Sequence, residues 1–452
     1  MRSSPPRRIG LIAGGRTLPR EIADSLARRG AEVHVVALEG EATGTLAAYR
    51  PTVLNIGRIG AIIASLRRAG CREVVFAGTI SRPDLSRIRP DLGFFRALPT
   101  VVGLMRAGGD DAVLRGVIAF FEGCGLAVVG PLDVAPELAL AEGPAGSHAP
   151  DAPAVADADL GLRAIAAMAP FDIGQAVIVA EGRVVAIEGA EGTDAMIERF
   201  AAGRLAQRAA GEAATGGLVV KRAKPGQELR VDLPVIGPDT VRRAAGADLS
   251  GIAVEAGRVL VAERAETVRL ADAHRLFVTG VAGGTGEPRG IGEARSPAGQ
   301  GNDVHGARSA GGGAVPKGAI RRLGRKAIPP AAADDIWRAA NLIAALGAYC
   351  ASRAVVIADR HVLVVEAGEG AEAAIARSAA FDQWGKRRWR GRLGVAVLDL
   401  GREATVPAVE AAHAAGLAGV AVRLRKFAAS VPEPVVARAD ALGLFMAGVD
   451  AG

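Results

Sequence analysis

The sequence predicts an α/β fold in three parts: an N-terminal parallel-sheet domain, a second α/β domain, and a degenerate repeat of the second domain after a flexible linker. Short apolar runs alternate with helical patterns through residues 1–135, as expected for a doubly wound sheet. Another set of strand and helix patterns fills residues 136–282. A weaker version of that set returns at 331–452, beyond a Gly- and Pro-rich stretch at 283–330.

Length and charge limit the classes of function. The 452 residues suffice for two or three domains, and half of them are apolar, so each domain can build a core. The formal net charge is +7. Residues 283–330 hold eight Lys or Arg and three Asp or Glu, which accounts for five of these seven charges. The basic character therefore belongs mostly to the linker, and no nucleic-acid partner is expected.

Neither a membrane span nor a disulfide framework is expected. No apolar run approaches the roughly 20 residues that a membrane span requires. The first apolar run is interrupted at Gly14-Gly15, so no signal peptide is expected at the N-terminus. We therefore expect a cytoplasmic protein. Cys71, Cys124 and Cys350 are odd in number and far apart, which favours buried free thiols over a disulfide or a zinc site.

The first strand, 9–13, leads through Gly14-Gly15 into a helix with Pro19 in its first turn, and the next strand is 32–38. This order is typical of the opening of a nucleotide-binding sheet, where glycines let the backbone approach a phosphate at the helix N-terminus. The G-x-G-x-x-G spacing is missing, so a simple tight turn is the alternative. Glu39 and Glu41 close the second strand, where a ribose hydroxyl could be bound.

The alternation continues with strands at 52–56, 73–77 and 126–129 and helices at 59–69, 94–105 and 112–121. Ligands of such sheets bind at the carboxyl ends of the strands. The loop after the strand at 73–77 carries Thr79, Ser81 and Arg82, and Arg82 is the expected phosphate contact there. Asp110 and Asp111 precede a helix, where they either cap it or hold a metal ion.

The second domain begins with a helix at 158–168 and a hairpin of strands at 176–180 and 184–187. Thr193 is a natural N-cap for the next helix, and the N–H groups of that turn could hold an anion. A helix from Thr240, a strand at 251–254 and a final strand ending near Gly280 complete this compact α/β domain.

The most informative stretch is 217–241. Its apolar strand, 218–220, is followed by Lys221 and Lys224, a Pro-Gly turn, and Asp232 between apolar residues. Two lysines, a turn that exposes backbone N–H groups, and the acids Asp232 and Asp239 indicate a phosphate and metal site. A solvated loop with a helix cap at 238–240 is the alternative.

The tail repeats the second domain. The stretch 353–379, which begins at Arg353, aligns without a gap with the stretch 175–201, which begins at Gln175. Glu366, Glu369 and Glu372 then correspond to Glu188, Glu191 and Asp194. The tail lacks both lysines, the Pro-Gly turn and the Asp232 segment, so we expect it to be catalytically inactive.

Several motifs occur in a fixed order between Ile9 and Gly280: GLIAGG, SRPD, GDDAVLR, DIGQAVIV, EGTDAM, KPGQELRVDLPVIGPDT and LFVTG. With these motifs the chain resembles the UDP-2,3-diacylglucosamine hydrolases of lipid A biosynthesis, the type unrelated to calcineurin-like metallophosphoesterases. The resemblance implies a Rossmann-like N-terminal domain, a C-terminal α/β domain and a substrate bound between them. It also implies magnesium-dependent attack of water on the pyrophosphate, which releases UMP and 2,3-diacylglucosamine 1-phosphate (lipid X).

The essential acid of that family falls on Asp232, and Lys221 and Lys224 are the expected phosphate partners. Further metal candidates are Glu191, Asp194, Asp110 and Asp111. The expected nucleotide-sugar site consists of Gly14, Gly15, Thr79, Ser81, Arg82, Gln175, Thr193 and Gln227. The chain departs from the family pattern at Arg16, where a third glycine is usual. It also departs at Pro131-Leu132-Asp133, where a His-bearing segment is common, and in the whole tail.

The acyl chains of such a substrate imply an apolar groove and peripheral contact with the inner membrane surface. The oligomeric state stays open, and one hypothesis is that the tail copy occupies a surface through which other members pair domains. A second class of function is a non-catalytic nucleotide-sugar binding or regulatory protein, which the degenerate repeat suggests. The missing dinucleotide fingerprint argues against a third, a nicotinamide-dependent oxidoreductase.

Overall fold

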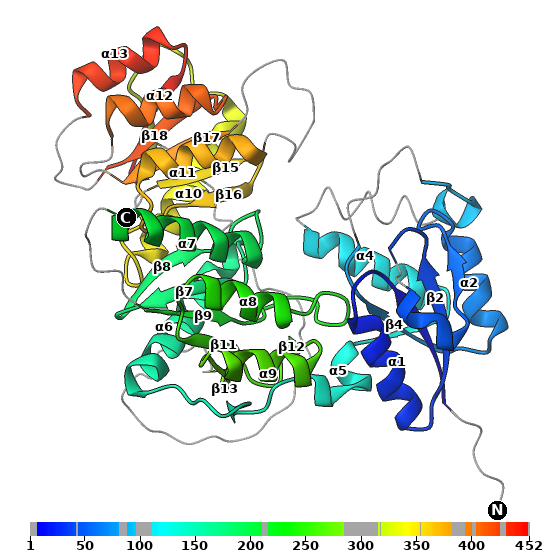
Figure 1. The fold of residues 1–452 in the computed structure, drawn as a ribbon. Helices are drawn as coiled ribbons and strands as arrows, with labels where there is room; N and C mark the ends of the chain where they lie inside the picture. Colours follow the sequence, from blue (N-terminus) through cyan, green and yellow to red (C-terminus); the bar gives the residue numbers. More distant parts are fainter. Residues whose placement is uncertain are drawn as a thin grey trace, which may run out of the picture. The chain divides into compact units, whose positions relative to one another are not determined.

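The computed structural model describes residues 7–41, 44–80, 88–95, 110–209, 216–283, 315–316, 318–352, 354–381, 394–399, 404–424 and 431–450 (Figure 1). The side chains of 110–113 and 206–209 are outside this description. Contacts divide the chain into two compact units. One comprises 1–150, 221–245 and 250–282, and the other comprises 151–220, 246–249 and 283–452.

The N-terminal sheet has five parallel strands in the order β3-β2-β1-β4-β5. They are β1 (Arg8–Ala13), β2 (Glu32–Leu38), β3 (Thr52–Leu54), β4 (Glu73–Ala77) and β5 (Ala127–Val129). The order reverses direction between β1 and β4, which is the switch point where ligands of such sheets bind. The predicted doubly wound sheet is therefore confirmed.

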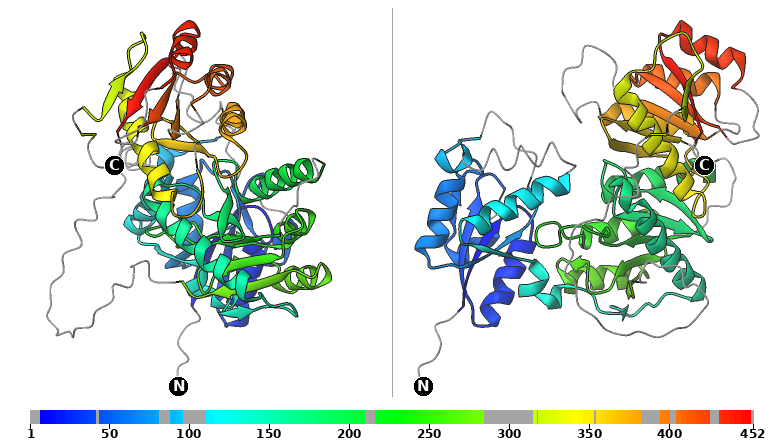
Figure 2. Two further views of the ribbon diagram at one scale, coloured as in Figure 1. Left: turned by 90° about the vertical axis from the view of Figure 1, so that its left-hand side faces the viewer. Right: turned by 180° about the vertical axis from the view of Figure 1, so that it is seen from behind.

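Helices cover both faces of this sheet (Figure 2). One core cluster joins α1 (Leu18–Arg28) to the sheet, and another joins α2 (Ile59–Arg68) and α4 (Asp110–Gly123) to its other face. Short turns of helix follow β2 and β5: η1 (Gly44–Tyr49), α5 (Pro131–Val134) and η3 (Pro136–Leu138). Most of the helix predicted at 94–105 lies outside the described residues.

The second sheet has six strands in the order β6-β13-β11-β9-β7-β8. They are β6 (Gly143–Pro144), β7 (Ala176–Ala180), β8 (Arg183–Ile187), β9 (Leu218–Lys221), β11 (Gly251–Glu255) and β13 (Phe277–Val281). A separate parallel pair joins β10 (Val235–Ile236) to β12 (Leu260–Val261). The helices that accompany these strands are α6 (Ala152–Met168), η4 (Ala169–Phe171), α7 (Thr193–Ala209), α8 (Pro238–Gly246) and α9 (Arg264–Ala273).

The third sheet, in the tail, has the order β14-β19-β18-β17-β15-β16. Its strands are β14 (Ile320–Arg322), β15 (Ala354–Ala358), β16 (His361–Val365), β17 (Val395–Asp399), β18 (Gly419–Arg423) and β19 (Phe445–Val449). It packs on an apolar core with α11 (Ala371–Arg377), α12 (Val406–Ala414) and α13 (Glu433–Ala441). Helix α10 (Pro330–Leu346) and η5 (Ser378–Phe381) complete the tail.

The second and third sheets correspond strand by strand. Their edge hairpins, β7-β8 and β15-β16, each contain a register irregularity, between Ile178 and Val179 in one and between Val356 and Ile357 in the other. These two positions coincide in the gap-free alignment of the two copies, which supports the duplication. One expectation fails, because β14 lies inside the segment that the sequence predicted as a structureless linker.

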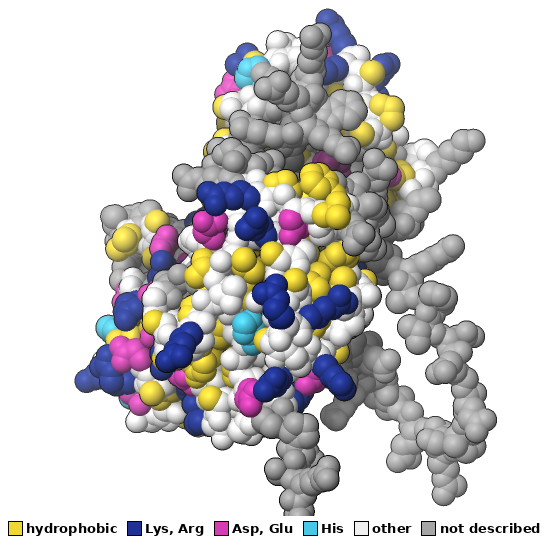
Figure 3. All heavy atoms as spheres, turned by 90° about the vertical axis from the view of Figure 1, so that its right-hand side faces the viewer, with side chains coloured by type: hydrophobic (Ala, Val, Ile, Leu, Met, Phe, Trp, Pro, Cys, Tyr) yellow, Lys and Arg dark blue, Asp and Glu magenta, His cyan; other side chains and the backbone are white. Residues whose placement is uncertain are grey.

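The cysteines, the helices and the surface charges each bear on a prediction from the sequence. Cys71, Cys124 and Cys350 are free cysteines, as predicted; Cys71 and Cys350 are buried as expected, whereas Cys124 is half-buried. No helix among the described residues combines the length and the apolar character that crossing a bilayer requires. On the face drawn in Figure 3, basic side chains are scattered among acidic and apolar ones rather than gathered in one patch.

Candidate functional site

Two turns meet at the switch point of the N-terminal sheet: Gly14-Gly15 after β1, and Gly78-Thr79 after β4. The N–H of Gly15 donates to the carbonyl of Thr79 at 2.7 Å, and the N–H of Thr79 donates back at 3.2 Å. A Cβ atom at Gly14 would lie 2.4 Å from the oxygen of Thr79. The close approach of the two backbones therefore requires glycine at this position.

The N–H groups of Gly14 and Gly15 donate to Ala77 and Thr79, at 2.8 and 2.7 Å. A phosphate held by these glycines would have to compete with both bonds, which favours the tight-turn interpretation of the motif. Thr79 lies at the turn as expected, whereas Ser81 and Arg82 lie outside the described residues.

Arg16 follows this turn with φ of 70°, in the left-handed region that disfavours side chains other than glycine. This geometry explains why glycine suits the position. One guanidinium nitrogen of Arg16 lies 3.8 Å from a carboxylate oxygen of Asp239, and both side chains are more than half exposed. The pair is therefore a weak one.

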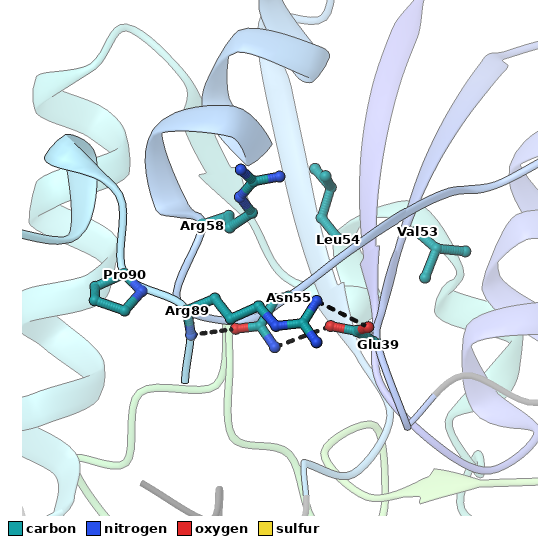
Figure 4. A pocket seen from close by; sticks show the side chains of 7 residues that line it. All are labelled: Glu39, Val53, Leu54, Asn55, Arg58, Arg89 and Pro90. Atoms are coloured by element: carbon teal, nitrogen blue, oxygen red, sulfur yellow. Dashed lines mark hydrogen bonds and ion pairs between the residues drawn. The ribbon is translucent and has the colours of Figure 1, made fainter. Parts of the chain in front are cut away.

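A polar pocket of about 320 Å³ lies beside the carboxyl ends of β2 and β3 (Figure 4). Asn55 organises it: its amide donates to Glu39 at 3.0 Å, and its oxygen accepts from the N–H groups of Gly57 and Arg89. Glu39 also lies 3.8 Å from the Arg89 guanidinium. The carboxylate expected to bind a ribose hydroxyl thus faces a pocket but already has two polar neighbours. The lining consists of Glu39, Val53, Leu54, Asn55, Arg58, Arg89 and Pro90.

The segment that carries Asp232 leaves β9 at Lys221 and returns at β10. The buried ammonium group of Lys221 donates to the carbonyl of Val235 at 3.0 Å, which ties the two ends of the segment together. Lys221 thus has a structural task in addition to the phosphate contact predicted for it. Lys224 is half-buried at the start of the turn.

Asp232 is held by Gln227, whose side-chain Nε2 donates to Oδ2 at 2.6 Å. The Gln227 oxygen accepts from the backbone N–H of Lys224 at 2.9 Å, so both ends of the amide are engaged. Oδ1 of Asp232 makes no hydrogen bond to any described residue. One carboxylate oxygen is therefore fixed and the other is available to a water, an ion or a substrate.

The neighbours of Asp232 anchor the segment. Val231 packs against the core cluster that contains Ile12 and Val36, whereas Leu233 packs against the cluster that contains Ile9 and Leu11. The packing of both partly buried neighbours restricts the backbone between them. Asp232 thus lies between two partly buried apolar residues.

Charged side chains brace the same segment. Arg230 binds Glu228 through two nitrogens at 2.8 Å and Glu122 at 2.9 Å. Hydrogen bonds from Arg230 lower the pKa of Glu228 below its ordinary value. At the start of the segment, buried Arg222 pairs with buried Glu255 at 3.0 Å. Neither Arg222 nor Glu255 was predicted, because their spacing of 33 residues gives no local pattern.

Gln175 and Thr193 converge on a residue that the sequence did not place in the site. The buried carboxylate of Glu188 accepts the backbone N–H of Gln175 at 2.7 Å and the hydroxyl of Thr193 at 3.0 Å. Thr193 is the first residue of α7, and its side-chain hydroxyl donates to Glu188. The two predicted substrate contacts are brought together, with Glu188 as their shared acceptor.

The predicted metal candidates do not form a cluster in the described part of the chain. No group of three or more His, Cys, Asp or Glu side chains with the arrangement of a metal site occurs there. One oxygen of Glu191 accepts from both Arg199 and Arg377 at 3.0 Å, which argues against a role as a metal ligand. Asp194 lies in the first turn of α7, and the side chains of Asp110 and Asp111 lie outside the description.

Comparison with known proteins identifies related domains across most of the chain. A family model for the LpxI N-terminal domain matches residues 8–138, and one for the LpxI C-terminal domain matches residues 141–279 and 320–397. The second C-terminal range lies in the tail copy. The UDP-2,3-diacylglucosamine pyrophosphatase LpxI of Caulobacter vibrioides is 42% identical over 275 residues, which is 61% of this chain and 98% of that protein. The chain belongs to the LpxI family, with a second copy of the C-terminal fold appended to it.

Proposed function

We propose that this protein hydrolyses the pyrophosphate of UDP-2,3-diacylglucosamine, releasing UMP and 2,3-diacylglucosamine 1-phosphate (lipid X) in lipid A biosynthesis. The similarity to a protein named for the pyrophosphatase activity supports this substrate. The observation that carries the proposal in this chain is Asp232, a carboxylate with one oxygen fixed by Gln227 and the other not bonded to a described residue.

Magnesium is part of the proposal. Mg²⁺ in phosphate-transfer sites is commonly held by one or two carboxylates together with the phosphates of the substrate, so a large cage of acids is not required. Asp232 fits this role, and it would hold the ion together with pyrophosphate oxygens. When bound, the ion would neutralise charge that develops on the phosphates.

The residues around Asp232 have separate tasks in this mechanism. Asp232 orients the attacking water or accepts its proton, and Gln227 keeps the carboxylate in one orientation. Lys224, half-buried at the turn, is positioned to bind phosphate. Lys221 holds the segment closed through Val235 and contributes its charge to the same region.

The test is release of UMP from UDP-2,3-diacylglucosamine by the full-length protein, measured with Mg²⁺ and after chelation. Wild type is expected to require the metal, and Asp232→Asn to lose nearly all turnover. Asp159→Asn is the matched control, because Asp159 is an exposed acid outside the predicted site and is paired with Arg163. Equal loss in both variants would remove Asp232 from its proposed role.

The alternative, a nucleotide-sugar binding protein without turnover, gives a different result in the same assay. Substrate would then bind to wild type, as measured by calorimetry, while no UMP appears under any metal condition. For the catalytic proposal we place the protein in the cytoplasm, in peripheral contact with the inner membrane, because its substrate carries acyl chains. Sedimentation with vesicles that contain the substrate tests this placement.

A further inference from the structure

Four charged residues form a ring where the tail copy contacts the first copy of the C-terminal fold. We call this set the Glu–Arg ring: Glu191 and Arg199 from the first copy, Glu369 and Arg377 from the tail. Arg199 lies 3.0 Å from Glu191 and 3.5 Å from Glu369. Arg377 lies 3.0 Å from Glu191 and also pairs with Glu369. All four side chains are at least four-fifths buried.

The ring is symmetric in its connections. Glu369 and Arg377 are the residues that align with Glu191 and Arg199 in the gap-free alignment of the two copies. Each arginine binds the glutamate of its own copy and the glutamate of the other copy. Exchanging the two copies therefore leaves the pattern of contacts unchanged, which is the property of an isologous two-fold interface.

Backbone contacts around the ring follow the same rule. The N–H of Ala190 donates to the carbonyl of Leu363 at 3.4 Å. The corresponding residues with the copies exchanged are Gly368 and Val185, and a Cβ atom at Gly368 would lie 3.4 Å from the Val185 oxygen. The same pair of backbone positions is therefore in contact whichever of the two copies contributes each member.

The strands at this interface are the end strands of their sheets, β8 in the second sheet and β16 in the third. The first helices of the two copies, α6 and α10, also pack together. Arg338 of α10 lies over the ring of Phe171 at 5.8 Å. The interface therefore covers an edge of each sheet, which otherwise invites association with another chain.

We propose that this face of the first copy, formed by β8, the turn at 189–192 and Arg199, is a self-complementary surface that fits a second copy of the same domain. The tail copy takes the place of that second subunit. The tail retains both members of the ring, whereas it lacks counterparts of Lys221, Lys224 and Asp232. It has kept what pairing requires and lost what the proposed chemistry requires.

This proposal makes a specific statement about the oligomeric state. Because the tail is part of the same chain, its docking is intramolecular and has the advantage of a high effective concentration. Full-length protein should therefore be monomeric. If the tail is repelled, the intact face of the first copy becomes available to the identical face of another chain, with Arg199 of each chain binding Glu191 of the other.

The test reverses the charges of the ring in the tail alone, in the full-length protein. In Glu369→Arg/Arg377→Glu the pair within the tail persists, but both contacts between the copies become repulsive. The mass from light scattering should change from that of a monomer to twice that value, with a concentration dependence. Hydrogen exchange in β8 and β16 should report the release of the tail at concentrations below dimerisation.

A compensating variant is the control. Adding Glu191→Arg/Arg199→Glu to the double variant restores attraction in every pair of the ring, so monomer and slow exchange should return. A double variant that releases its tail and stays monomeric at about 100 μM overturns the proposal, as does one whose tail stays docked. A dimer that persists in the quadruple variant also overturns it. Circular dichroism confirms that each variant is folded.

Discussion

The side-chain amide of Gln227 donates to Oδ2 of Asp232 at 2.6 Å while its own oxygen accepts from the backbone of Lys224 at 2.9 Å. The side-chain amide cannot exchange the positions of its nitrogen and oxygen without losing both bonds. Because one of these bonds is to the backbone of Lys224, the orientation of the carboxylate depends on the turn at Pro225-Gly226. The sequence predicted that Gln227 contacts substrate. This pair of bonds supports a positioning role for Gln227, and the substrate contact stays a prediction.

Replacing Gln227 by leucine should lower kcat by about 10- to 100-fold, as is typical when the partner that orients an active-site ligand is removed. KM should change less, because the substrate itself loses no contact. Gln227→Glu should be more severe, since it places a second negative charge beside Asp232. Steady-state kinetics on both variants separates the roles: an unchanged kcat with a raised KM would show direct substrate contact.

Removing one member of the buried pair of Arg222 and Glu255 should lower the free energy of unfolding strongly, whereas replacing both members by apolar residues should lower it much less. Glu255→Leu removes the carboxylate that lies 3.0 Å from the buried guanidinium of Arg222, so it should lower the free energy of unfolding by about 3 to 5 kcal/mol. Arg222→Met should also lower it, although Glu255 keeps Arg258 at 3.9 Å. The double variant Arg222→Met/Glu255→Leu should recover much of the loss.

Urea unfolding of the two single variants and the double variant gives the coupling energy of this pair. Arg269→Met with Glu266→Leu is the matched control, since that pair is bound at 2.7 Å but more than a third exposed. Its coupling should stay below about 1 kcal/mol. Equal coupling in the two cycles would contradict the importance of burial.

Most of the fold could be predicted because many of its strands are buried on both faces and therefore appear as short apolar runs, such as 9–13 and 218–220. The gap-free alignment of Arg353 with Gln175 likewise predicted a third sheet like the second. Strand β14 was missed, because a three-residue strand with two exposed arginines has no apolar pattern. Its existence depends on pairing with β19, which is distant in sequence.

The candidate site was predictable only where its residues are close in sequence. Lys221, Lys224, Gln227 and Asp232 fall within one short segment, so their grouping could be inferred. The contact of Arg377 with Glu191 spans 186 residues, and no local pattern announces it. The hydrogen bonds from the N–H groups of Gly14 and Gly15 to the carbonyls of Ala77 and Thr79 could not be predicted either. Only the fold determines which acceptors reach these N–H groups.

Gly14→Ala should destabilise the N-terminal domain by about 1 to 3 kcal/mol, the usual cost of forcing atoms into a packed site. The added Cβ would lie 2.4 Å from the backbone oxygen of Thr79, which cannot move without disturbing β4. Gly44→Ala is the matched control, because a Cβ there meets no atom within 4 Å. If thermal unfolding gave both variants the midpoint of wild type, the close approach of Gly14 to the Thr79 backbone would be contradicted.

Arg16→Gly should stabilise the protein by up to about 1 kcal/mol, since relief of the left-handed conformation outweighs the added freedom of the unfolded chain. Arg16→Ala keeps the strain and removes the side chain, so it should be no more stable than wild type. The kinetics of the same variants decide a second question. A raised KM in both would identify Arg16 as a phosphate contact, and unchanged KM values would limit its role to the turn.

Asp335 gives the tail copy a dependence on pH. Its carboxylate is 5% exposed and accepts the backbone N–H of Arg360 at 2.7 Å. Burial raises the pKa of Asp335 to about 6, above the ordinary value of 3.8. Between these two values the folded state binds more protons than the unfolded state, so the stability of the tail copy must fall as the pH rises from about 4 to about 6.

Asp335→Asn keeps the acceptor for Arg360 and removes the titrating group. The variant should match wild type near pH 4 and exceed it above pH 6 by on the order of 2 to 3 kcal/mol, since each pKa unit corresponds to about 1.4 kcal/mol. Unfolding followed across this pH range checks the difference, with the exposed neighbour Asp334→Asn as control. A constant difference between Asp335→Asn and wild type across the range would mean that Asp335 titrates alike in the folded and unfolded states. Burial would then be compensated by the bond from Arg360, and the tail copy would carry no acid-stabilised carboxyl group.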